Sequence, residues 1–225
     1  MGLFDKTTSN SSGSTSNDVP DDVVTKLVSQ LLSVGIDGVG PVKPAKESAD
    51  KALHKANGNV EKAVKDLVSD HVKAATAGGF VTGLGGFITL PVALPANVLE
   101  FYVLATRMTA GVAHLRGYNL AEPSVRAAVL LALTGNQADE VLSKVGLGGA
   151  MGGSITKLAL SKLPAAALMV VNKAVGFQIV KSSTSKLLVK LGKGVPVAGG
   201  VVGGGLDAWM MQRIGSHARK EFPRQ

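Results

Sequence analysis

Residues 95–117 read PANVLEFYVLATRMTAGVAHLRG, and this stretch decides the fold class. Pro95 suits the first turn of a helix, where its missing N–H is not needed, and Gly117 suits the position just past a helix end. Most residues between them are apolar, and the stretch ends in Arg116. We expect one long helix over residues 95–116.

The same start and stop signals predict further helices on both sides of this one. The Val and Ile runs do not alternate with polar residues, so no strand is expected. Three glycines and two prolines make residues 35–44 a connector, and Asn57-Gly58 and Asn59 are expected to end one helix and cap the next. The expected helices cover residues 20–34, 45–56, 59–75, 122–133, 136–145, 164–191 and 198–221. The predicted fold is an all-α, compact multi-helix bundle with Gly-rich close helix packing.

Composition divides the chain into three parts. Residues 1–19 are polar and low in complexity, which predicts a disordered tail. Residues 20–44 form an N-terminal helix with its Gly/Pro connector, and residues 45–225 form the main helical domain. The chain has no cysteine, which excludes disulfides, thiolate metal sites and cysteine nucleophiles. The first residues lack the apolar core of a secretory signal, so we expect a cytoplasmic protein.

Charge is distributed unevenly along the chain. Residues 1–140 hold 12 Lys/Arg and 14 Asp/Glu, whereas residues 141–225 hold 12 Lys/Arg and only Asp207 and Glu221. The net charge of the second part is therefore +10. Such asymmetry indicates an anionic partner for the basic part of the chain.

The clearest organised basic surface is a lysine face over residues 181–193. Val180, Leu187 and Leu191 lie opposite the lysines, as in the basic amphipathic helices that bind anionic membranes. The alternative is a solvated face on an ordinary bundle helix. The candidate membrane contacts are Lys181, Lys186, Lys190 and Lys193.

Two segments are uncharged and rich in glycine. No charged residue lies between Lys73 and Glu100, a run of 26 residues, but its glycines and prolines argue against one continuous membrane helix. The run 195–206 has 12 uncharged residues, too few to span a bilayer. On a helix, Gly199 with Gly203 and Gly200 with Gly204 would let another backbone approach closely. Segments 78–95 and 195–206 either pack in the core or enter a membrane.

A polar stripe crosses the long helix of residues 95–116. Glu100, Arg107 and His114 recur every seven residues and so share one face, with Asn97 one turn earlier. Buried charges need partners, so an interhelical ion-pair network is the first interpretation, with Asp207 as a candidate partner. The other interpretations are the lining of a ligand cavity and, last, acid–base catalysis.

Motifs for other chemistries are missing from the sequence. The histidines do not form a His-x-x-x-His pair, and no Gly-rich loop is followed by Gly-Lys-Ser/Thr. No Gly-x-Ser-x-Gly elbow is present. The basic part lacks the arginine clusters and stacking aromatics of nucleic-acid binders. We therefore expect no enzyme, no metal, no cofactor and no nucleic-acid partner.

Three stretches together resemble the EcsC protein family of bacteria. Residues 76–97 read TAGGFVTGLGGFITLPVALPAN, residues 107–118 read RMTAGVAHLRGY, and residues 195–204 read VPVAGGVVGG before His217-Ala218 and Glu221-Phe222. The resemblance covers residues 45–222. It implies a helical, intracellular, membrane-associated protein and carries no catalytic residues with it.

The expected function follows from the resemblance and the charge. A non-enzymatic, peripheral membrane-associated or lipid-binding protein would use its basic C-terminal half against anionic lipid on the inner face of the cell membrane. The alternative is a soluble protein–protein interaction module with its Gly-rich apolar segments wholly in the core.

Overall fold

The computed structural model describes residues 20–40, 42–77, 96–146, 163–192 and 199–225, and of these it gives the backbone alone for 77, 184–192 and 199–204. Every regular element in these ranges is a helix, which confirms the predicted all-α bundle. The predicted tail, residues 1–19, lies outside them. The elements are α1 (Asp21–Gln30), the π-helical turn η1 (Leu31–Asp37), α2 (Ala45–Lys55), α3 (Val60–Ala77), α5 (Ala96–Leu115), α6 (Pro123–Ala132), the 3-10 turn η2 (Gly135–Gln137), α7 (Ala138–Lys144), α9 (Ala165–Gly192) and α10 (Gly199–Glu221).

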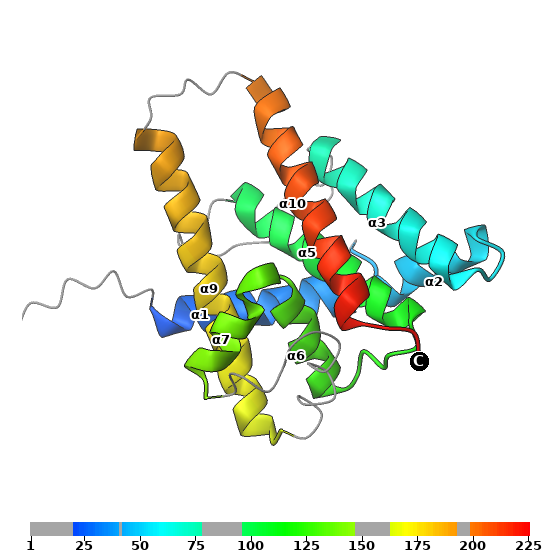
Figure 1. Ribbon diagram of the computed structural model, residues 1–225, viewed down its shortest axis with the longest axis horizontal. Coiled ribbons are helices and arrows are strands. Elements are labelled where there is room, and N and C mark those ends of the chain that lie inside the picture. Colours follow the sequence, from blue (N-terminus) through cyan, green and yellow to red (C-terminus); the bar gives the residue numbers. More distant parts are fainter. Residues whose placement is uncertain (1–19, 41, 78–95, 147–162, 193–198) are drawn as a thin grey trace, which may run out of the picture.

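Helix α5 is the centre of the bundle, as Figure 1 shows. It packs against η1, α2, α3, α6 and α10. Fourteen of its 20 residues are buried, so nearly its whole circumference contacts other helices. A helix that is apolar on most sides is expected in such a position.

The signals at the helix ends act as the sequence predicts. Asn57 and Gly58 both have positive φ, 52° and 79°, and end the α2 segment. The backbone N–H of Lys62 donates to Asn59 Oδ1 at 3.0 Å, so Asn59 caps α3. Gly117, with φ 91°, ends α5. These local features fix the α2–α3 hairpin and the exit from the central helix.

The first helix continues further than predicted. The chain does not leave helical structure at Gly35 but continues as η1 to Asp37, and Leu31, Val34, Gly35 and Ile36 are buried. A Cβ on Gly35 would lie 2.8 Å from Cβ of Thr106. Only glycine lets η1 approach α5 this closely, and burial of the neighbouring side chains holds the turn there. The predicted connector therefore begins after η1.

Two other glycines mark close helix contacts. A Cβ on Gly176 of α9 would lie 2.6 Å from Val24 Cγ1 of α1, and one on Gly215 of α10 would lie 2.7 Å from Val68 Cγ1 of α3. Close packing through glycine thus occurs in the bundle. Helix α1 joins the same core through its contact with α9.

Candidate functional site

Arg107, at the middle of the predicted polar stripe, is buried at the contact between α5 and α2. Its guanidinium donates to the backbone oxygens of Lys43 and Pro44 and to Ser48 Oγ, the last at 2.6 Å. Burial lowers the pKa of Arg107, and the charge of Glu47 opposes that shift. The donors on both guanidinium NH₂ groups are used within the protein, so this residue joins α5 to the start of α2.

The other members of the stripe lie apart from one another. His114 Nε2 lies 2.8 Å from Asp50 Oδ1 of α2, both side chains being partly exposed. Partial burial raises the pKa of Glu100, and Asn97 is exposed in the first turn of α5. Asp207 lies in α10 with a partly buried side chain, and it is not among the acceptors of Arg107 or His114. Among the described residues, Arg107 and His114 thus both bind α2 or the loop before it, but only His114 faces a carboxylate, whereas Arg107 is held by neutral acceptors and not by an ion pair.

His71 of α3 lies outside the polar stripe that the sequence predicts and is buried. The pKa of His71 is lowered to about 4, mainly by burial and also by the charge of Arg107, whereas the hydrogen bond to the Leu67 oxygen and the charge of Asp70 oppose the shift. The ring Nδ1 lies 2.8 Å from that oxygen. His71 is therefore neutral at pH 7. Within the described residues, no cluster of His, Asp and Glu could hold a metal ion.

The predicted lysine face falls partly outside the described side chains. Lys181 is exposed on α9. Lys186 and Lys190 lie in the same helix, where only the backbone is described, and Lys193 lies beyond it. Gly199, Gly200, Gly203 and Gly204 lie in the first turns of α10, also described by backbone alone, and segment 78–95 lies outside the described ranges.

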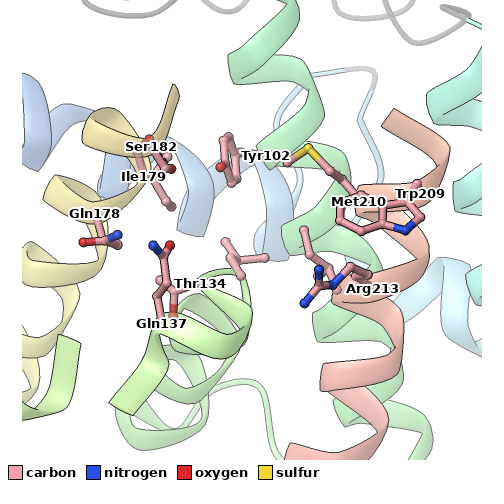
Figure 2. Close-up of a pocket in the computed structure, with 11 residues that line it drawn as sticks. Tyr102, Thr134, Gln137, Gln178, Ile179, Ser182, Trp209, Met210 and Arg213 are labelled. Carbon is pink, nitrogen blue, oxygen red and sulfur yellow. Dashed lines mark hydrogen bonds between the residues drawn. The ribbon is translucent and has the colours of Figure 1, made fainter. Parts of the chain in front are cut away.

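A groove of about 340 Å³ lies between α9 and α10, with α5 and the end of α6 beneath it (Figure 2). Trp209 stands at its edge with 55% of its surface exposed. The groove is lined by apolar and polar residues from four parts of the chain. They are Tyr102, Leu133, Thr134, Gln137, Gln178, Ile179, Ser182, Trp209, Met210, Arg213 and Ile214.

The polar groups of the groove are of two kinds. Thr134 and Ser182 donate to the backbone oxygens of Leu131 and Ile179, and so need no further acceptor. Gln178 is only 8% exposed, yet among the described residues its amide has no hydrogen-bond partner. The hydroxyl of the buried Tyr102 likewise has no partner within the described ranges. Neither is one of the buried side-chain atoms that lack a partner, so both polar groups are open to the groove, where another molecule, water or ligand, can bind them.

The charge at the groove is positive. The Arg213 guanidinium lies over the Trp209 ring, 4.8 Å from its centroid, and no ion pair to Arg213 occurs in the part of the chain that the structure describes. His217 lies one turn further along α10, near Gly135. Partial burial lowers the pKa of His217, and the charges of Lys220 and Arg213 lower it further. An anion would be attracted to this part of the groove.

The fold and the groove define an all-α bundle protein with a positively charged, partly apolar groove between two long helices. No helix in the described part of the chain combines the length and apolarity needed to cross a membrane. A family model, the EcsC protein family, matches residues 6–224. The chain therefore belongs to the EcsC protein family. Comparisons with curated proteins and with solved structures gave no match.

The family match is longer than the resemblance seen in the sequence, because it includes α1 and η1. The groove was also missed by sequence reasoning. Its signals were weak: the only tryptophan of the chain lies four residues before Arg213, and Gln178 interrupts an apolar run in α9. These residues have no shared motif, because helices far apart in the sequence bring them together.

Proposed function

We propose that this EcsC-family protein is a non-enzymatic peripheral membrane protein that binds anionic lipid on the inner face of the cell membrane. The contact would be the end of the bundle where α9 ends and α10 begins. The observation that carries the proposal is that two large apolar side chains on neighbouring turns of α10 are exposed. Leu206 has 36% of its surface exposed and Trp209 has 55%. Tryptophan with an apolar neighbour and a nearby cation suits a lipid–water interface.

The directions of four helices support this choice of surface. Val68 of α3, Met108 of α5 and Gly215 of α10 meet at one level of the bundle. From that level, α3 continues to its last residue, Ala77, while α5 and α10 are followed backwards to their first residues, Ala96 and Gly199. These three helix ends lie in the upper half of Figure 1, together with the last turn of α9. Segment 78–95 joins α3 to α5 in the sequence, and segment 195–206 begins between α9 and α10 and continues into α10. Both uncharged, Gly-rich segments are thus attached at the same end of the molecule.

Charge supports the same surface. Lys181 is exposed on α9, and the sequence places Lys186, Lys190 and Lys193 between it and the start of α10. Each lysine near an anionic membrane surface contributes about 1 kcal/mol to binding. Apolar contact from α10 and electrostatic attraction from α9 would act together, which is the usual requirement for stable peripheral binding.

The test is co-sedimentation with vesicles of phosphatidylglycerol and phosphatidylcholine, compared with vesicles of phosphatidylcholine alone. We expect binding to the anionic vesicles only. Changing Lys186, Lys190 and Lys193 to Glu should weaken it by about 100-fold, since three favourable charges are lost. The matched control changes Lys46, Lys51 and Lys55, all exposed on α2, to Glu, and should weaken it far less.

Equal binding to both kinds of vesicle, binding to neither, or equal losses in the two triple variants would contradict the proposal. Failure to bind either vesicle would favour the second candidate, a protein interaction module. One observation supports that candidate: Met169 and Val170, near the start of α9, are 66% and 52% exposed. They lie at the opposite end of α9 from the proposed lipid contact.

A further inference from the structure

We infer that the groove between α9 and α10 binds one single-chain anionic amphiphile, of the fatty-acid type, with its carboxylate at Arg213 and its chain along the apolar wall. The inference rests on the proposed function, because both assign an anionic lipid as the ligand. It goes further by placing one molecule of that lipid in a defined site, a binding event that needs no membrane surface.

The apolar wall accounts for the chain of the ligand. Ile179 from α9, Met210 and Ile214 from α10, and the Tyr102 ring from α5 surround the space between the helices (Figure 2). Its volume of about 340 Å³ is at the low end of the range of about 300–1,000 Å³ for ligand sites. A space of this size suits one alkyl chain better than the two chains of a membrane phospholipid.

Arg213 accounts for the charge of the ligand. Its guanidinium is fixed in position over Trp209 and has no carboxylate partner within the described ranges. A guanidinium can donate two parallel hydrogen bonds to a carboxylate. Lys220 and Arg213 are both near enough to His217 for their positive charges to lower its pKa, so the field at this end of the groove favours an anion and opposes a cationic amphiphile.

Gln178 and Tyr102 add two polar groups to the same groove. Both residues are more than nine-tenths buried, 8% and 6% exposed, both line the groove, and neither side-chain polar group has a partner among the described residues. Neither is one of the buried side-chain atoms without a partner, so both polar groups are open to the groove, where water or a ligand can bind them. The groove therefore combines an apolar wall, two accessible polar groups and the cation of Arg213.

Trp209 makes the site directly measurable, because it is the only tryptophan of the chain and it borders the groove. The probe is 2-bromododecanoate, whose bromine is next to the carboxylate and so close to Trp209 in the proposed complex, added to the full-length protein below its micelle concentration and without vesicles. Bromine on the chain quenches an indole that it touches. We expect saturable quenching of Trp209 with one molecule bound per protein, and competition by unbrominated dodecanoate.

Variants test the two halves of the ligand separately. Arg213→Gln should weaken binding by about tenfold or more, because a charge-assisted hydrogen bond is lost. Ser182→Phe should block the groove with its charge intact. The matched control, Arg224→Gln, removes the same charge from an exposed residue outside the groove and should leave binding within about twofold.

Three outcomes would overturn the inference: no saturable quenching, equal binding of dodecyltrimethylammonium, or equal effects of Arg213→Gln and Arg224→Gln. These outcomes are separable from failure of the proposed function. If anionic vesicles bind the protein but the bromo acid does not quench Trp209, the groove inference fails and the membrane proposal stands. If neither binds, both fail. Circular dichroism of each variant confirms that the helices are retained.

Discussion

Arg107 and Gln178 are both buried polar residues on largely apolar helices, but their surroundings differ. At the α2–α5 contact, Arg107 donates to two backbone oxygens and a hydroxyl, and His114 pairs with Asp50. In the α9–α10 groove, the Gln178 amide and the Tyr102 hydroxyl have no partner among the described residues. In the first region these polar side chains have their hydrogen-bond partners within the chain, and in the second region they do not have them among the described residues.

This difference teaches how a buried polar residue can be interpreted. A polar group whose partners all come from the same chain contributes to folding, and its replacement leaves those partners unpaired. A polar group that has no partner within the chain and is open to a groove contributes little to folding, so an apolar side chain in its place keeps or raises the stability of the free protein. The two regions should therefore respond in opposite directions to the removal of a polar side chain.

The largest effect is expected from Arg107→Leu. The change leaves the Lys43 and Pro44 oxygens and Ser48 Oγ without their donor at a buried contact, so the free energy of unfolding should fall by about 3 kcal/mol. Urea unfolding measures it. Quenching of Trp209 by the bromo acid, measured where the variant is folded, should be unchanged. If the free energy of unfolding falls by less than 1 kcal/mol, the polar side chains at the α2–α5 contact would stabilise the fold no more than those in the α9–α10 groove.

His71 makes the α2–α5 side sensitive to pH. The pKa of His71 is about 4 in the folded protein, against the ordinary histidine value of 6.5 in the unfolded chain. Between these values the unfolded chain binds more protons, so stability falls as the pH decreases through this window. From pH 7 to pH 5 the loss attributable to His71 should be about 2 kcal/mol.

The variant His71→Gln isolates this contribution, because glutamine can still donate a hydrogen bond and does not titrate. The difference in unfolding free energy between the parent protein and the variant should change by about 2 kcal/mol from pH 7 to pH 5. Urea unfolding at each pH gives that difference. A difference that stays constant with pH would mean that the pKa of His71 is the same in the folded and the unfolded protein.

Much of the fold could be predicted because its signals are local. Pro123 at the first turn of α6, Asn59 at the cap of α3 and Gly117 after α5 each act through residues within one turn. The π-helical turn η1 was missed because it depends on Gly35 lying against Thr106, a contact between distant parts of the chain. Local patterns do not contain such a contact.

The site was harder to predict for the same reason. Helical periodicity placed Glu100, Arg107 and His114 on one face, and two of them do bind a neighbouring helix. Periodicity could not identify α2 as that neighbour. Nor could it bring Tyr102, Gln178 and Arg213 together, since they come from α5, α9 and α10. Glycine composition correctly indicated close helix packing, but the described close contact on α10 is at Gly215.

The smallest effect, and the one of opposite sign, is expected from Gln178→Leu. The change removes an amide that has no partner within the described ranges and adds apolar surface to a buried position. The free energy of unfolding should therefore rise by about 1 kcal/mol, while binding of the bromo acid weakens. Urea unfolding and Trp209 quenching measure the two effects on the same samples.

The matched control for this change is Gln137→Leu, which alters an exposed amide of the same groove. Its effect on stability should stay within about 0.5 kcal/mol, as for most surface changes. If Gln178→Leu instead destabilises the protein by more than 1 kcal/mol, the amide is already satisfied by bound water. The α9–α10 groove would then be as complete as the α2–α5 contact, and its unpaired donors would no longer argue for a ligand.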